Sequence, residues 1–151
     1  IIENNKYAMG TSVARSSALT DFSKRGASFN IPGMQVDGMD VRAVHEAGMK
    51  AVDYARSGKG PFILEMQTYR YRGHSMSDPA KYRSKDEVER MRTERDPIER
   101  VRNRILEGKL ATEDEIKKID AEIRAIVNES AEFATNDQEP DPSELYTDVL
   151  R

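Results

Sequence analysis

The chain has 151 residues, of which 37% are hydrophobic and 34% are charged, and its formal net charge is −3. This length fits one ordinary domain with its own core. The charge gives no electrostatic reason to expect nucleic acid, since residues 81–129 carry 13 basic against 13 acidic side chains. Because cysteine is absent, a disulfide framework, a thiolate zinc site and a cysteine nucleophile are excluded. The apolar runs are too short to cross a membrane.

The first residues predict the end of a buried strand. Ile1 and Ile2 are β-branched and run into the polar stretch "ENNKYAMG". No initiator methionine or secretory signal is present, so we expect a fragment whose site is shared with the part before Ile1. From Glu3 to Pro32 neither a 3.6-residue nor a 2-residue period is sustained. We therefore expect a long irregular segment, which in compact domains is usually functional or mobile.

A strand, a helix and a second strand are predicted next. The stretch "MQVDGMD" indicates a short strand around Gln35 and Val36 with a turn at Asp37-Gly38, and Asp40 is a suitable N-cap. The helix that follows has small and apolar residues at helical spacing: Val41, Val44, Gly48, Ala51, Val52 and Ala55.

Ser57-Gly58 is expected to end this helix. The continuous apolar run from Phe62 to Leu64 then predicts a strand buried on both faces. Two strands joined through a helix by short connections indicate a parallel α/β unit.

The last third of the chain predicts amphipathic helices. "SKDEVERMRTE" and "DPIERVRNRIL" form two, the second with Asp96 as cap and Pro97 at its first position. A third begins at a capping box, Thr112 with Glu115. We expect these helices to pack on this domain or on a partner, through the apolar faces Ile98, Val101 and Ile105, and Ile116, Ile119, Ile123, Ile126 and Val127. The acidic tail is expected to be an extended surface segment.

The first candidate site follows the first strand. Glu3, Asn4 and Asn5 lie where open α/β sheets place their ligands. Asn amides and free backbone carbonyls are hard oxygen donors that suit Mg²⁺ or Ca²⁺. A plain turn explains the same residues, and the carboxylate that such a site normally needs would have to come from elsewhere. Composition alone leaves both interpretations open.

The second candidate is the stretch "TYRYRGHSMSDPAKYR", Thr68 to Arg83. Its basic side chains could bind a phosphate or a carboxylate. His74 follows the flexible Gly73, and imidazole titrates near neutral pH. Ser75 and Ser77 could accept a phosphoryl group. A solvated loop with a surface histidine is the alternative. The other histidine, His45, is expected to be a surface or interface residue. The basic residues are Arg70, Arg72, Lys81 and Arg83.

Several strings in this order resemble the alpha subunits of pyruvate dehydrogenase first components, which are thiamine-diphosphate enzymes. They are "ENNKYAMGTS", "DFSKRG", "IPGMQVDGMDV", "SGKGPFILEMQTYRYRGHSMSDP" and "YR" before a charged helix. The resemblance covers the chain, tightly from Ile1 to Arg83 and more loosely through the helices. It implies an α/β fold in which residues 1–85 are the C-terminal part of a thiamine-diphosphate-binding parallel-sheet domain, and residues 86–151 are a helical C-terminal extension with an acidic tail.

The resemblance also implies cofactor ligands. Asn5 matches the last Asn of the family's thiamine-diphosphate motif and would bind Mg²⁺ through its side chain, while Tyr7 would bind the ion through its main-chain carbonyl. The family's motif begins with Gly-Asp-Gly, and the Asp that completes the metal site is not in this chain. We therefore expect the chain alone not to bind thiamine diphosphate tightly.

His74 matches the family's active-site histidine, near the diphosphate, which is implicated in transfer of the acetyl unit to a lipoyl group. Ser75 matches a hydroxyl at the mouth of the substrate channel that a dedicated kinase phosphorylates in mitochondrial relatives, and Ser12 matches another such site. The third such position is Lys81 here, which weakens the expectation of kinase control and favours a bacterial enzyme. The arginines around His74 are expected to hold the loop over the bound cofactor.

The function implied is oxidative decarboxylation of pyruvate with acetyl transfer to a lipoyl group. The expected partners are a beta subunit, in an alpha2beta2 heterotetramer, and the lipoyl domain of the acetyltransferase component, with neither nucleic acid nor membrane involved. The expected location is the bacterial cytoplasm, or the mitochondrial matrix in a eukaryote. The alternatives are the alpha subunit of a branched-chain 2-oxo acid or acetoin dehydrogenase, and a non-catalytic subunit-interaction fragment.

Overall fold

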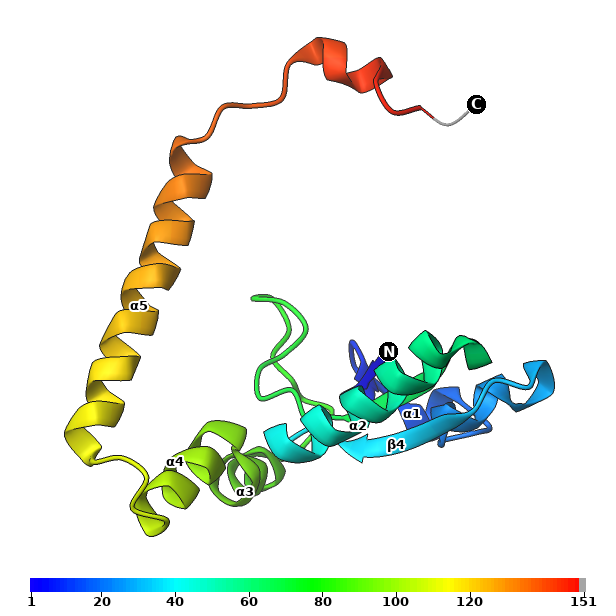
Figure 1. The fold of residues 1–151 in the computed structure, drawn as a ribbon, viewed down its shortest axis with the longest axis horizontal. Helices are drawn as coiled ribbons and strands as arrows, with labels where there is room; N and C mark the ends of the chain where they lie inside the picture. Colours follow the sequence, from blue (N-terminus) through cyan, green and yellow to red (C-terminus); the bar gives the residue numbers. More distant parts are fainter. Residues whose placement is uncertain (150–151) are drawn as a thin grey trace. The chain divides into compact units, whose positions relative to one another are not determined.

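The computed structural model describes residues 1–149 of the chain (Figure 1). These residues form two compact units, residues 1–104 and the part from Ile105 onward. The first unit is mixed α/β, and the second is helical. The family resemblance predicts a division after residue 85, between the cofactor-binding domain and the helical extension. That division stays a prediction.

A three-stranded parallel sheet is the centre of the first unit. Its strands are β1 (Ile2–Asn4), β5 (Ile63–Gln67) and β4 (Gly33–Asp37), in the order β1-β5-β4. The predicted parallel strand–helix–strand unit is confirmed. In register, Asn4 of β1 and Asp37 of β4 both lie beside Gln67 of β5, so the three strands end together at one edge.

Helix α2 (Val41–Tyr54) packs on this sheet, and Figure 1 shows it running along β4. As predicted, Asp40 caps it, because its Oδ1 accepts hydrogen bonds from the backbone N–H of Arg42 at 3.0 Å and of Ala43 at 3.4 Å. The core between them is formed by Val36, Ala47, Leu64 and Met66. Burying one such large apolar side chain contributes about 1.5–3 kcal/mol.

The predicted end of α2 is also confirmed. A π-helical turn, η2 (Ala55–Lys59), follows α2, and Gly58 within it has a φ of 77°. This left-handed conformation is readily adopted only by glycine, so the helix ends where Ser57-Gly58 predicted. The second strand begins at Ile63, one residue after Phe62, and its centre from Leu64 to Met66 is buried.

The segment from Glu3 to Pro32 is more ordered than the sequence predicted. It contains a hairpin of β2 (Tyr7–Ala8) and β3 (Thr11–Ser12), the short helix α1 (Val13–Ser16) and a 3₁₀ segment, η1 (Phe22–Phe29). The order comes from distant contacts. A Cβ on Gly26 would lie 2.6 Å from the Ile31 carbonyl oxygen and 2.8 Å from Cδ1 of Ile63. Local periodicity cannot reveal such packing, so the expectation of an irregular segment was wrong here.

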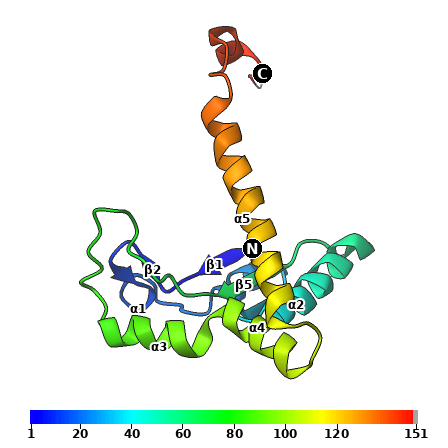
Figure 2. The same ribbon diagram turned by 90° about the vertical axis from the view of Figure 1, so that its left-hand side faces the viewer.

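Helices α3 (Lys85–Arg95) and α4 (Pro97–Glu107) follow, as predicted. Asp96 caps α4 by accepting from the backbone N–H of Ile98 at 2.9 Å and of Glu99 at 3.2 Å. Ion pairs attach these helices to the end of β4, with Arg95 at 2.6 Å from Asp37. Figure 2 shows α3 beginning at the long loop that leaves β5.

The second unit contains one long helix, α5 (Glu113–Asn136), and a 3₁₀ turn, η3 (Pro142–Tyr146). The predicted capping box of Thr112 and Glu115 is present. Four residues of the predicted apolar stripe are 53–61% exposed, namely Ile119, Ile123, Ile126 and Val127. None of the helices in residues 1–149 has the length and apolar character required to span a membrane.

Candidate functional site

The turn after β1 is built by two asparagine side chains. Asn4 Oδ1 accepts a hydrogen bond from the backbone N–H of Lys6 at 3.0 Å, and Asn5 Oδ1 accepts one from that of Tyr7 at 3.1 Å. Lys6 has a φ of 73°, a left-handed conformation that is unfavourable for a residue with a Cβ. The two side-chain bonds therefore hold a strained turn at the carboxyl edge of the sheet.

Glu65 lies beneath this turn and was missed by the sequence analysis. It is 0% exposed, and its carboxylate accepts hydrogen bonds from Asn4 Nδ2 at 2.7 Å, Ser23 N–H at 2.9 Å and Gln35 Nε2 at 3.1 Å. Burial acts to raise the pKa of Glu65, but the hydrogen bonds from Asn4, Gln35 and Ser23 outweigh it, so its pKa lies below the ordinary value. The available signal was a carboxylate in the middle of the apolar string "FILEMQ".

The turn after β1 contains two oxygen donors of the kind that a magnesium site uses. Asn5 Oδ1 and the Tyr7 carbonyl are the hard oxygen donors that Mg²⁺ prefers. Among residues 1–149 no group of three or more His, Asp or Glu side chains is placed to hold a metal ion. The turn therefore suits a metal only as part of a larger set of ligands. Asn5 and Tyr7 stay predicted ligands.

Asp78 shapes the loop that carries His74 and Ser75. Its carboxylate accepts from the backbone N–H of His74 at 2.7 Å and of Ala80 at 2.8 Å, and from the Tyr82 hydroxyl at 2.8 Å. These bonds lower the pKa of Asp78. His74 and Ser75 are exposed in the loop that projects from the sheet in Figures 1 and 2. The His74 imidazole has no hydrogen-bond partner within residues 1–149.

Two of the four basic side chains in this stretch hold the loop rather than remaining free for an anion. Arg83 donates to the carbonyl oxygens of Arg70, Tyr71 and Arg72, the last two at 3.0 and 2.8 Å. Arg70 Nη2 donates to the Met9 carbonyl at 2.9 Å and to the Tyr82 hydroxyl at 2.8 Å. These two arginines thus hold the loop backbone, and their holding it over a bound cofactor stays a prediction. The other two, Arg72 and Lys81, are exposed.

The structure brings the two candidate stretches together through Tyr82. Its ring centroid lies 5.2 Å from that of Tyr7, and a Cβ on Gly10 would lie 3.0 Å from its Cδ1. With the bond from Arg70 to Met9, the loop of residues 68–83 is attached to the turn and hairpin of residues 5–12. We call this attachment the tyrosine junction. Neither Tyr82 nor Asp78 was singled out from the sequence.

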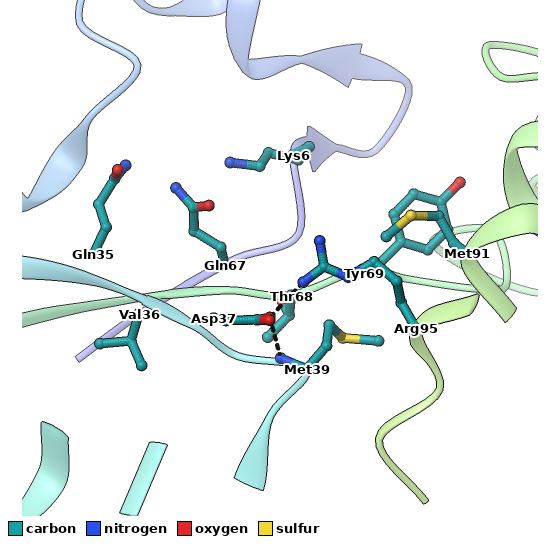
Figure 3. Close-up of a pocket in the computed structure, with 10 residues that line it drawn as sticks. All are labelled: Lys6, Gln35, Val36, Asp37, Met39, Gln67, Thr68, Tyr69, Met91 and Arg95. Atoms are coloured by element: carbon teal, nitrogen blue, oxygen red, sulfur yellow. Dashed lines mark hydrogen bonds and ion pairs between the residues drawn. The ribbon is translucent and has the colours of Figure 1, made fainter. Parts of the chain in front are cut away.

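A pocket of about 360 Å³ adjoins the turn at the ends of β4 and β5. Figure 3 shows the side chains of Lys6, Gln35 and Gln67 around one open space, while Arg95 is directed to Asp37. Polar groups thus line the carboxyl edge of the sheet, where ligands bind in open α/β folds.

The remaining predicted residues lie apart from this edge or at its margin. His45 is exposed on α2, in agreement with a surface residue. Ser12 ends β3 and precedes α1, and its side chain is half-buried and makes no capping bond. Ser75 Oγ lies 3.0 Å from Ser77 Oγ.

Comparison with known proteins identifies a family. The family model described as "Dehydrogenase E1 component" matches residues 1–143. The chain is 71% identical over 150 residues to the pyruvate dehydrogenase E1 component subunit alpha of Rhizobium meliloti, covering 99% of this chain and 43% of that protein. The Rickettsia conorii subunit of the same name is 54% identical over 149 residues, covering 99% and 45%.

A testis-specific, mitochondrial form of this subunit from Rattus norvegicus is 50% identical over 146 residues, covering 96% of this chain and 37% of the rat protein. The chain thus spans less than half the length of these curated relatives. Since the family model matches nearly all of it, the chain belongs to the dehydrogenase E1 component family.

Proposed function

We propose that this chain is the C-terminal portion of the alpha subunit of a pyruvate dehydrogenase E1 component, which decarboxylates pyruvate oxidatively and passes the acetyl unit to a lipoyl group. The observation that carries the proposal is the tyrosine junction, which joins the turn of Asn5 and Tyr7 to the loop of His74. The names of the relatives, at up to 71% identity, support the same subunit.

The cofactors proposed are Mg²⁺ and thiamine diphosphate. Asn5 Oδ1 and the Tyr7 main-chain carbonyl would contribute two oxygens to the ion, and the residue that supplies a carboxylate would lie outside residues 1–149. When bound, thiamine diphosphate supplies the carbanion chemistry that decarboxylation of a 2-oxo acid requires. The protein part of the task is to position this group and to exclude water from the carboxyl edge of the sheet.

His74 is the proposed proton-handling residue. Imidazole exchanges a proton near neutral pH, and the bond from the His74 N–H to Asp78 at 2.7 Å fixes the backbone that carries it. Ser75, next to it, would line the mouth of the channel by which a substrate reaches the cofactor. Lys81 occupies the position of a third kinase-target serine of mitochondrial relatives, so we propose no control at that position.

The proposed partners are a beta subunit, in an alpha2beta2 heterotetramer, and the lipoyl domain of the acetyltransferase component. Support comes from the exposed apolar stripe on α5, which is of the kind that a partner subunit covers. Residues 1–85 would belong to the cofactor domain and residues 86–151 to the helical extension. The bacterial relatives favour the cytoplasm as the location, and the rat relative is mitochondrial.

The test uses the whole alpha subunit assembled with its beta subunit. Decarboxylation that depends on thiamine diphosphate is measured with pyruvate and with a branched-chain 2-oxo acid, and cleavage of the carbon–carbon bond is measured with acetoin, which has no carboxylate to lose. We expect the highest kcat/KM with pyruvate, and a large loss in Asn5→Ala and in His74→Ala. A higher kcat/KM with a branched-chain 2-oxo acid or with acetoin would instead assign the chain to the alpha subunit of that dehydrogenase. Unchanged rates in both variants would contradict the proposed roles.

A further inference from the structure

Glu65 is a charged residue in a place that an apolar side chain would fill. It lies on the central strand β5, between the core residues Leu64 and Met66, and is 0% exposed. A buried carboxylate is costly unless donors surround it. The donors here include neutral groups on Asn4, Ser23 and Gln35. These donors require a hydrogen-bond acceptor at position 65.

The two carboxylate oxygens face different parts of the fold. Oε2 accepts from Ser23 N–H and Gln35 Nε2, and so holds the segment η1 and the strand β4. Oε1 accepts from Asn4 Nδ2 at 2.7 Å, directly below the turn. Oε2 thus supports η1 and β4, whereas Oε1 bonds to the last residue of β1, from which the turn begins.

The bond to Oε1 decides which way the Asn4 amide points. An amide has a donor end and an acceptor end, so fixing Nδ2 on Glu65 directs Oδ1 toward the backbone N–H of Lys6, which it accepts at 3.0 Å. That bond holds Lys6 at its left-handed φ of 73°. The turn in this shape then lets Asn5 Oδ1 accept from Tyr7 N–H at 3.1 Å.

We infer that Glu65 is a positioning residue for the metal ligands Asn5 and Tyr7, acting through the orientation of the Asn4 amide. The inference rests on the proposed function, which makes Asn5 and Tyr7 ligands of Mg²⁺. Groups that orient metal ligands from behind contribute strongly to affinity, and their removal typically weakens metal binding about 10–100-fold.

The experiment measures Mg²⁺ affinity in the whole alpha subunit assembled with its beta subunit. Mg²⁺ is titrated calorimetrically at saturating thiamine diphosphate, so no turnover is needed. In Glu65→Gln the single amide oxygen can face only one side, and if it accepts from the two donors of Ser23 and Gln35, the amide nitrogen faces the donor end of Asn4. The Asn4 amide must then rotate and abandon the Lys6 N–H. We expect the Kd for Mg²⁺ to rise about 10-fold or more. Asn4→Ala should give a similar rise without altering β5, and it carries the test if Glu65→Gln does not assemble.

Two further variants separate positioning from general stability. Asp40→Ala removes the N-cap of α2, outside the pocket and the turn, and we expect the melting temperature to fall with an unchanged Kd for Mg²⁺. The double variant Asn4→Asp/Glu65→Gln restores complementary pairing, since the introduced amide donates to the introduced carboxylate, whose second oxygen still accepts from Lys6. Its Kd should return toward the wild-type value, whereas Asn4→Asp alone, with two carboxylates facing each other, should not bind normally.

An assembled Glu65→Gln or Asn4→Ala variant with wild-type Mg²⁺ affinity would overturn the inference, as would an equal loss of affinity in Asp40→Ala. Either result leaves the proposed function intact, because the wild-type assembly would still bind the metal. If the wild-type assembly bound no Mg²⁺ in the presence of thiamine diphosphate, the proposed function itself would fail.

Discussion

Tyr82 contacts Tyr7 with ring centroids 5.2 Å apart, and its hydroxyl accepts from Arg70 and donates to Asp78, each at 2.8 Å. One side chain therefore touches the turn after β1 and also the bonds that shape the His74 loop. Because these contacts join segments far apart in the sequence, order in the loop and order in the turn should depend on each other.

The Tyr82 hydroxyl can be removed without removing the ring. In Tyr82→Phe the bonds to Arg70 and Asp78 are lost, and we expect the His74 loop to be destabilised by about 1–2 kcal/mol while the contact with Tyr7 remains. Hydrogen exchange at the backbone amides of His74 and Ala80 measures this opening. Tyr71→Phe is the matched control, because its hydroxyl bonds to Asp96 at 3.2 Å, outside the loop. Equal protection of the loop in wild type and Tyr82→Phe would contradict the prediction.

Gly73 should be intolerant of a side chain. A Cβ there would lie 2.4 Å from the Asp78 carbonyl oxygen, so Gly73→Ala must displace the loop backbone next to His74. Gly48→Ala is the control, because a Cβ at that site in α2 meets nothing within 4 Å and should stabilise the helix by about 0.5–1 kcal/mol. Urea unfolding compares global stability, and limited proteolysis compares the loops. A loop equally resistant in both variants would disprove the crowding argument.

The loop should lose its order in acid. Hydrogen bonds from the His74 and Ala80 backbone amides and from the Tyr82 hydroxyl place the pKa of Asp78 below its ordinary 3.8. A carboxyl whose folded pKa is depressed stabilises the folded loop above its unfolded pKa, and this contribution is lost as pH falls through the folded pKa. We expect the Ala80 amide NMR signal, which reports on Asp78 away from the His74 imidazole, to keep its position from pH 7 to 5 and to move only below the ordinary pKa. An Ala80 signal that shifts between pH 7 and 5 would refute this.

The attachment of α3 and α4 to the sheet should be weak and salt-dependent. Asp37 pairs with Arg95 at 2.6 Å and with Arg100 at 3.4 Å, and these side chains are 37–42% exposed. We expect a double-mutant cycle of Asp37→Ala with Arg95→Ala to give a coupling of about 0.2–1 kcal/mol at low salt, falling as ionic strength rises. The pair Lys117 and Asp114, at 3.2 Å on α5, offers a more exposed comparison. A coupling energy that stays the same as the salt concentration rises would contradict this prediction.

The cofactor should add little to the thermal stability of the chain of residues 1–151 by itself. Its turn offers two oxygen donors and no carboxylate cluster within the described residues, so Mg²⁺ with thiamine diphosphate should leave its melting temperature unchanged. The whole alpha subunit with its beta subunit, heated under the same conditions, should be stabilised. A clear rise for the shorter chain would show that residues 1–151 bind the cofactor without further ligands.

The strand–helix–strand unit and the later helices could be predicted because their signals are local. Asp40 before α2, Gly58 after it, Asp96-Pro97 at α4 and the Thr112 capping box each act within a few residues, through backbone conformation or a nearby N–H group. The motifs around Asn5 and His74 could also be found by sequence, since they identify the family without any knowledge of their separation in space.

Only the tertiary structure revealed what holds the site. Glu65 is sixty-one residues from Asn4, and Arg70 is sixty-one from Met9. Neither hydrogen bond therefore produces a periodic pattern in the sequence. From composition, Arg70 and Arg83 could bind an anion. In the structure, Arg83 donates to backbone carbonyls and Arg70 donates to the Tyr82 hydroxyl. Sequence determined which chemical groups the site contains. The packing of parallel strands, which brings distant polar groups to one edge, decided which of those groups bind each other and which remain available for a ligand.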